Sequence, residues 1–139
     1  MARYALDTDI ATLLLSRHPQ VSARVTAEPY QNVWAPIVTA HELIVGWLPQ
    51  LTRQQPPDRY VWAYAGLQRV LEFLSDVNLL PFDDTAAREY ARLRTTYRRL
   101  GANELRIAAI ALSTGAILVT RNRQDFAQIV GVSIEDWSQ

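Results

Sequence analysis

Residues 3–7 of this 139-residue chain read Arg-Tyr-Ala-Leu-Asp, an apolar run that ends on a carboxylate and passes directly into Thr8 and Asp9. A short buried strand fits the apolar part, and the polar turn after it can cap a helix that extends to about residue 16. A second run of this kind, Ala-Ile-Leu-Val-Thr, occupies residues 116–120 and also leads into a polar turn. Continuous apolar strands are typical of parallel sheets that are covered on both faces.

Outward from these two runs, strands are expected to alternate with helices along the whole chain. The expected strands lie at residues 3–7, 32–36, 77–82, 116–120 and 132–135, and the expected helices at 8–16, 20–28, 39–49, 60–74, 85–100, 103–114 and 123–129. Pro49 should end or kink the third helix, and Gly101 and Gly115 should stop the fifth and sixth. This order predicts one α/β domain over residues 1–139, with a parallel sheet between two helix layers. The working site of such a sheet lies beyond the carboxyl ends of its strands.

Composition excludes several classes of chemistry. The chain has no cysteine, and all 14 of its basic residues are arginine, so disulfides, thiolate metal sites and lysine-dependent catalysis are ruled out. No apolar run approaches the roughly 18–20 residues of a membrane-spanning helix. A signal peptide needs an uninterrupted apolar core, and Asp7 and Asp9 interrupt the first apolar stretch of this chain. We therefore expect a cytoplasmic protein that does not enter a membrane.

Three carboxylates occupy positions in the predicted elements that suit a functional site. Each of them also has a purely structural explanation. Asp7 ends the first strand, but it could equally cap the first helix. Glu42 follows Thr39 with the T-x-x-E spacing of a capping box, which is the more economical local interpretation. Glu104 shares helical spacing with Ile107 and the alanines after it, so it lies on the stripe that faces the core. A buried carboxylate there requires an arginine partner, helix N-terminal amides or a cation.

Asp7 and Glu104 come from elements that should meet at one edge of the sheet, and Glu42 stands at another helix start. The turn from Thr120 to Asp125 should join them, although capping of a short helix explains that turn locally. Carboxylates that are forced together raise one another's pKa, so a cluster persists only with a compensating cation. Hard oxygen ligands without cysteine or histidine favour Mg²⁺ or Mn²⁺ over Zn²⁺.

Four segments in this order resemble the signature of PIN-domain ribonucleases, and most closely the VapC-type toxins of toxin–antitoxin pairs. The segments are residues 6–10 (Leu-Asp-Thr-Asp-Ile), 39–43 (Thr-Ala-His-Glu-Leu), 101–109 (Gly-Ala-Asn-Glu-Leu-Arg-Ile-Ala-Ala) and 118–126, which include Leu-Val-Thr-Arg-Asn and Asp-Phe. The resemblance covers essentially the whole chain. It implies a PIN-like fold and an endoribonuclease that uses Mg²⁺ or Mn²⁺.

The resemblance also implies roles for individual residues. It gives Asp7, Glu42 and Glu104 as metal ligands and catalytic residues, Asp125 as a further catalytic carboxylate, and Thr8, Thr120 and Asn122 as supporting residues. Glu104 stands where the family usually has aspartate, so its carboxylate lies one methylene further from the backbone. Asn122 stands where some members have a further aspartate, and Asp125 could supply either that charge or only a hydrogen bond.

The expected mechanism is hydrolysis of an RNA phosphodiester by a metal-activated water. Six arginines and only two glutamates lie between residues 88 and 106, so the neutral chain contains a basic segment. These arginines could form an ordinary solvated face. Alternatively, a set of arginines would contact RNA phosphates, namely Arg94, Arg98, Arg121 and Arg123.

Partners follow from the same resemblance. It implies a cognate VapB-type antitoxin, with Trp47, Trp62 and Tyr64 as aromatic residues available to it, and a homodimer. Tyr90, Leu93 and Tyr97 are candidate dimer contacts, with burial in the monomer equally open.

Two other functions stay open at this point. One is a catalytically weakened PIN-fold protein that acts by binding the antitoxin or RNA. The other is a haloacid-dehalogenase-like phosphatase. Asp7-Thr8-Asp9 resembles the nucleophile motif of these enzymes, but the chain has no lysine to take the place of their usual catalytic lysine.

Overall fold

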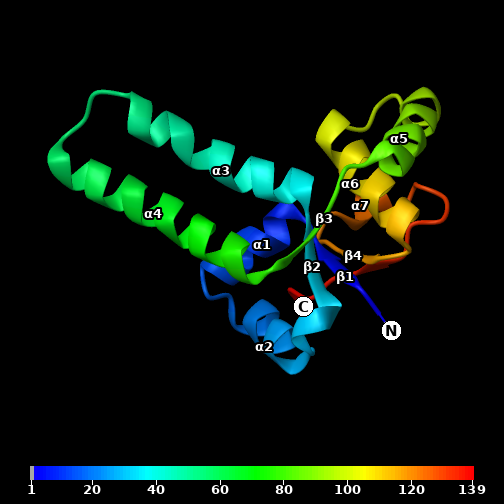
Figure 1. The fold of residues 1–139 in the computed structure, drawn as a ribbon, viewed down its shortest axis with the longest axis horizontal. Helices are drawn as coiled ribbons and strands as arrows, with labels where there is room; N and C mark the ends of the chain where they lie inside the picture. Colours follow the sequence, from blue (N-terminus) through cyan, green and yellow to red (C-terminus); the bar gives the residue numbers. More distant parts are fainter. Residues whose placement is uncertain (1) are drawn as a thin grey trace.

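The computed structural model describes residues 2–139 and shows a five-stranded parallel sheet between helices (Figure 1). The strands are β1 (Tyr4–Leu6), β2 (Val33–Pro36), β3 (Asn78–Leu80), β4 (Ile117–Val119) and β5 (Ile134–Glu135), in the spatial order β3-β2-β1-β4-β5. Every neighbouring pair is parallel. The predicted fold class is therefore confirmed. β1 and β4, the two runs that define the sequence pattern, lie side by side at the centre with Leu6 opposite Val119.

The helices are α1 (Thr8–Leu15), α2 (Pro19–Ala27), α3 (Ile37–Thr52), α4 (Pro57–Asp76), α5 (Asp84–Thr96), α6 (Ala102–Thr114) and α7 (Arg123–Phe126), with a 3₁₀ turn at Tyr30–Asn32. No helix within residues 2–139 combines the length and the apolar character that a membrane crossing requires.

Successive side chains of the central strands pack against different helices on the two faces of the sheet. Ala5 and Leu118 are buried in a cluster with residues of α5 and α6. Their neighbours Leu6 and Val119 are buried in a second cluster with residues of α1 and α2. Because side chains alternate along a strand, these two clusters lie on opposite faces of the sheet.

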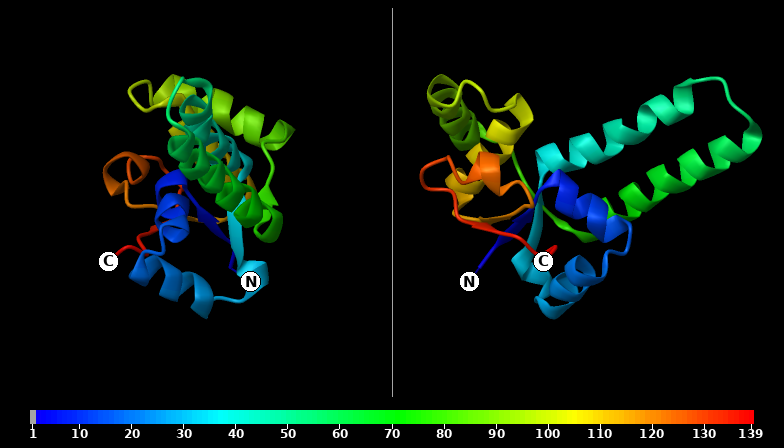
Figure 2. Two further views of the ribbon diagram at one scale, coloured as in Figure 1. Left: turned by 90° about the vertical axis from the view of Figure 1, so that its left-hand side faces the viewer. Right: turned by 180° about the vertical axis from the view of Figure 1, so that it is seen from behind.

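Helices α3 and α4 form a long hairpin that projects from one side of the sheet (Figures 1 and 2). A third buried cluster, built on Ala11, Leu43 and Val70, joins the base of this hairpin to α1. Further out, Trp47 packs edge-on against Trp62, their ring centroids 4.9 Å apart. Trp62 and Tyr64 are both substantially exposed.

Three predicted helix ends are wrong. Helix α7 ends at Phe126 and not near residue 129. Pro49 does not end α3, which continues to Thr52, and a kink at Pro49 stays a prediction. Helix α5 ends at Thr96 and not at Gly101. The hydroxyls of Thr95 and Thr96 both donate to the Arg92 carbonyl, and such side-chain bonds compete with the helical backbone pattern.

The next residue, Tyr97, is tied to a distant loop, because its hydroxyl accepts from the Val130 N–H at 3.0 Å. The prediction for Gly115 is confirmed: it caps α6 at φ 70°, a conformation that glycine adopts without strain.

The candidate dimer contacts are divided by burial. Leu93 is completely buried in the core of the chain itself, so it is not available to a second copy. Tyr90 and Tyr97 are partly buried against the same cluster.

Candidate functional site

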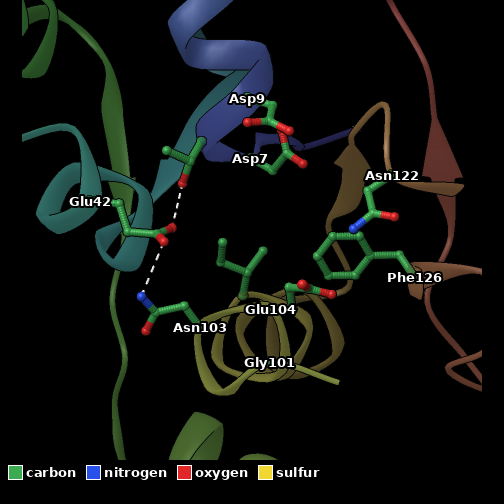
Figure 3. Close-up of a pocket in the computed structure, with 10 residues that line it drawn as sticks. Asp7, Asp9, Glu42, Gly101, Asn103, Glu104, Asn122 and Phe126 are labelled. Carbon is green, nitrogen blue, oxygen red and sulfur yellow. Dashed lines mark hydrogen bonds between the residues drawn. The ribbon is translucent and has the colours of Figure 1, made fainter. Parts of the chain in front are cut away.

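A cavity of about 240 Å³ lies at the carboxyl edge of the sheet, where the sequence predicts the working site. Asp7 follows β1, Glu42 comes from α3 and Glu104 from the first turn of α6, and all three line this cavity (Figure 3). Asp9 and Asn122 line it as well. The parallel topology thus brings together carboxylates that are up to 97 positions apart in the sequence.

Asp7 is the most deeply buried of these carboxylates, with 5% of its surface exposed. It caps α1, because its Oδ1 accepts from the Ile10 N–H at 2.9 Å. Burial raises the pKa of Asp7 to about 6, although hydrogen bonds from the Thr120 hydroxyl and the Ile10 amide oppose that rise. The capping interpretation and the functional one are therefore compatible, since the cap uses one carboxylate oxygen.

Glu42 is held by two side chains, one on each oxygen. The Thr8 hydroxyl donates to Oε1 at 2.5 Å, and the Asn103 amide donates to Oε2 at 3.1 Å (Figure 3). The capping-box interpretation is wrong, because α3 begins at Ile37, two residues before Thr39. The buried Thr39 hydroxyl instead donates to the Leu6 carbonyl at 3.1 Å and so ties α3 to β1.

Glu104 is the carboxylate that the fold leaves unsatisfied. Its Oε2 is buried and has no hydrogen-bond partner. The pKa of Glu104 is raised to about 7, mainly by burial, then by a side-chain hydrogen bond with Asp125 and by the charges of Asp125, Glu42 and Asp7. Neither ion pair found within residues 2–139 includes Glu104, so no arginine neutralises it there. Of the three remedies for a buried carboxylate, a cation fits this arrangement.

The turn after β4 is organised by its own hydrogen bonds. The Thr120 hydroxyl accepts from the Asn122 N–H at 2.9 Å. Asn122 caps α7 by accepting from the Asp125 N–H, and its amide donates to Asp125 Oδ2 at 3.1 Å. Local capping therefore accounts for Asn122 as expected. Asp125 does not line the cavity, but it lies close enough to Glu104 to raise its pKa.

The donor set suits a hard divalent cation such as Mg²⁺ or Mn²⁺, because it consists of carboxylate and amide oxygens. As they stand, no three His, Cys, Asp or Glu side chains among residues 2–139 are grouped closely enough to hold an ion. The unpartnered Glu104 oxygen and the raised pKa values of Asp7 and Glu104 mean that negative charge at the cavity is disfavoured unless something compensates it. A bound cation would compensate it, and Asp7, Glu42 and Glu104 are the residues that would hold it.

The four candidate RNA-binding arginines are exposed but do not gather at one place. Arg121 lies near the cavity, where its charge lowers the pKa of Asp7. Arg121 and Arg123 both lower the pKa of Asp136, although hydrogen bonds from Ser138 contribute more. Arg94 lies over the Tyr90 ring, 5.9 Å from its centroid, and Arg98 lines a separate hollow at the end of α5. None of these four arginines lines the acidic cavity.

Sequence reasoning missed Asn103, which holds Glu42 although the two residues are 61 positions apart. The sequence offers one signal for it: Asn103 precedes Glu104 in the first turn of α6 and has Arg106 one helical turn further on.

Comparisons with known proteins agree with this geometry. The family model described as the PIN domain matches residues 4–132. The tRNA(fMet)-specific endonuclease VapC of Shigella flexneri is 30% identical over 143 aligned positions, which cover 99% of this chain and all of that protein. Ribonuclease VapC5 of Mycobacterium tuberculosis is 37% identical over 101 positions, covering 70% of this chain and 68% of that protein. Among solved structures, DNA-bound VapBC from Salmonella typhimurium superposes with a TM-score of 0.82 at 26% identity and covers 99% of both chains.

Proposed function

Because the chain belongs to the PIN domain family, we propose that it is a metal-dependent endoribonuclease, the toxin of a VapBC-type toxin–antitoxin pair. The reaction is hydrolysis of RNA phosphodiester bonds with Mg²⁺ or Mn²⁺. Family membership removes the phosphatase alternative, which depended on the Asp7-Thr8-Asp9 segment alone.

The observation that carries the proposal is the convergence of Asp7, Glu42 and Glu104 on one cavity at the carboxyl edge of the sheet. Glu104 Oε2 has no partner there, although an unpaired buried carboxylate oxygen destabilises a fold. Carboxylates whose charged forms are disfavoured by burial and by one another, at the working edge of an α/β sheet, are best explained by a cation that functions there.

Each side chain has a distinct part in this mechanism. A bound Mg²⁺ or Mn²⁺ would polarise the phosphodiester and activate water for attack on phosphorus. Asp7 is fixed by its cap to α1, and Glu42 is fixed by Thr8 and Asn103, so both are oriented before an ion arrives. Glu104 would contribute its free oxygen and lose its proton as it did so. Thr120 and Asn122 hold the turn beside them.

The partners are proposed from the relatives. Solved structures that superpose on this chain include VapBC complexes, which supports a VapB-type antitoxin as the partner. The exposed Trp62 and Tyr64 on the α3–α4 hairpin are available to it. We further propose that the protein acts in the cytoplasm as a homodimer, and that Arg121 and Arg123 contact the phosphates of its RNA substrate.

Cleavage by the purified, antitoxin-free protein tests this function. Structured RNAs, including initiator tRNA because one relative is named for it, are incubated with Mg²⁺ or Mn²⁺ and with EDTA. The proposal requires metal-dependent cleavage that Asp7→Asn abolishes and that the exposed control Asp76→Asn leaves unchanged. RNA or antitoxin binding without any cleavage would instead identify a catalytically weakened binding protein.

A further inference from the structure

We propose that Asn103 and Arg106 form a relay that positions Glu42, which makes Asn103 a positioning residue for the reaction. The inference rests on the proposed function, because Glu42 matters to catalysis only if the acidic cavity holds an ion. It concerns two side chains to which the resemblance assigns no role.

The relay runs along one turn of α6 and then across to α3. Arg106 Nη1 donates to Asn103 Oδ1 at 2.7 Å, and Asn103 Nδ2 donates to Glu42 Oε2 at 3.1 Å. The close-up in Figure 3 shows Asn103 reaching from the start of α6 towards Glu42. The other oxygen of Glu42 accepts from the Thr8 hydroxyl. Asn103 and Arg106 are separated by three positions, so they lie on the same side of the helix.

The chemistry of the donors fixes the direction of the relay. A guanidinium has five donors and no acceptor, so Arg106 requires the oxygen of the Asn103 amide. The amide nitrogen must then point the other way, towards Glu42, which as a carboxylate only accepts. Glu42 and Arg106 therefore favour the same orientation of the amide, and Arg106 reinforces the role of Asn103 as a donor by binding its oxygen.

Arg106 itself is held in place by packing. Its guanidinium lies over the Tyr90 ring, 5.4 Å from the centroid, and the side chain is half-buried. Such a cation–π contact orients an arginine without using its hydrogen bonds. The guanidinium thus stays free to hold Asn103, and α5 supports the site through Tyr90.

The relay prepares Glu42 for a cation without satisfying it completely. Each Glu42 oxygen receives one hydrogen bond, from Thr8 or from Asn103, and a carboxylate oxygen has a further lone pair for an ion. A flexible glutamate that is already ordered loses less conformational entropy when it binds. Partners that orient a ligand in this way typically change metal affinity or activity about 10- to 100-fold when they are removed.

Binding of Mn²⁺ to the full-length protein without RNA tests the relay independently of cleavage. Calorimetry and the electron paramagnetic resonance of free Mn²⁺ would compare the wild type with Asn103→Ala, Asn103→Gln, Arg106→Ala and the Asn103→Ala/Arg106→Ala double variant. Arg88→Ala, an exposed arginine on α5, serves as the matched control. A thermal melt of each variant checks that it is folded.

We expect Asn103→Ala to weaken Mn²⁺ binding about 10- to 100-fold. Arg106→Ala should weaken it less, and the double variant should be no weaker than Asn103→Ala, because Arg106 acts only through Asn103. Asn103→Gln, which retains the amide, should recover part of the affinity. In cleavage assays, kcat and the Mn²⁺ requirement should change while the KM for RNA stays the same.

Three results would overturn the relay. Unchanged Mn²⁺ affinity in Asn103→Ala would show that Glu42 does not depend on the amide. Additive losses, with a raised KM for RNA in Arg106→Ala, would show that Arg106 contacts RNA and not Asn103. Absence of Mn²⁺ binding in the wild type would contradict both the proposed function and this inference. If Asp7→Asn abolished Mn²⁺ binding but the Asn103 and Arg106 variants bound Mn²⁺ like the wild type, only this inference would be contradicted.

Discussion

Replacing Asp7 with asparagine should abolish cleavage and, in the metal-free protein, raise stability more at alkaline pH than at acidic pH. Burial raises the pKa of Asp7 from 3.8 to about 6, which means that its charged form is disfavoured in the folded state. Asparagine keeps the side-chain oxygen that caps α1 through the Ile10 N–H but cannot become charged. The substitution therefore removes the titration and retains the cap.

The size and sign of the effect follow from the two pKa values. Because the folded pKa is higher, the stability that protonation contributes is fully present below about pH 4 and is lost as the pH rises through about 6. A shift of roughly 2 units corresponds to about 3 kcal/mol in the free energy of unfolding. Of this, about 1.4 kcal/mol is lost between about pH 5 and about pH 8. The Asp7 charge also raises the pKa of Glu104. Its removal therefore makes the charged form of Glu104 less unfavourable, which also stabilises Asp7→Asn more at alkaline pH.

Thermal unfolding in EDTA at the two pH values measures this difference. For a chain of this length, 1 kcal/mol corresponds to about 3–4 °C in Tm, so the Tm advantage of Asp7→Asn should be about 5 °C larger at the alkaline pH. The exposed control Asp76→Asn should show little change of this kind. An Asp7→Asn difference that is the same at both pH values, or larger at acidic pH, would refute the claim that buried charge at Asp7 destabilises the fold.

Three further predictions address the site and the hairpin. Glu104→Asp restores the residue usual in the family, so metal-dependent cleavage should stay intact or increase; a large loss would show that this cavity has a geometry of its own. Arg121→Ala should reduce the slope of log affinity for RNA against log salt by about 1, measured by filter binding, whereas an unchanged slope would exclude a phosphate contact. Gly66→Ala should destabilise the protein by about 1–3 kcal/mol in urea unfolding, because the new Cβ would lie 2.2 Å from the Trp47 ring. Gly46→Ala, with no atom within 4 Å of the new Cβ, should instead stabilise its helix by about 0.5–1 kcal/mol, and equal effects at the two glycines would contradict this packing argument.

The fold was predictable because its local signals agree with its tertiary contacts. The runs that became β1 and β4 are apolar throughout, as central strands of a parallel sheet must be, and each is followed by a side-chain cap. For two of the misplaced helix ends, those of α5 and α3, a tertiary contact or the position of the residue in the helix explains the difference. Tyr97 is tied by its hydroxyl to Val130, a contact that no local pattern around residue 97 reveals. Pro49 lies only three residues from the end of α3, so little of the helix follows the one hydrogen bond that proline cannot donate.

The site was predictable for a different reason. Asp7 and Glu104 stand at a strand end and a helix start, positions that the topology of a parallel sheet brings to one edge. Glu42 followed from resemblance alone, since its local pattern indicated a cap that the structure does not contain. Asn103 could not be found from local spacing, because its role depends on a carboxylate 61 positions away. Pattern reasoning therefore locates charged groups better than it locates the neutral groups that orient them.

The three carboxylates of the cavity differ in how far the chain has already prepared them. Asp7 has its cap, and Glu42 has one donor on each oxygen, so the fold orders both before any ligand binds. Glu104 has no donor on its buried oxygen, and its pKa of about 7 means that it is only partly charged near neutral pH. A divalent cation would thus meet two oriented ligands and one that must lose a proton to bind. Since the carboxylates that would hold the proposed ion also raise the pKa of Glu104, loss of that proton and binding of an ion would be coupled. The raised pKa values at this edge of the sheet and the proposed binding of a cation would therefore both follow from one arrangement of carboxylates.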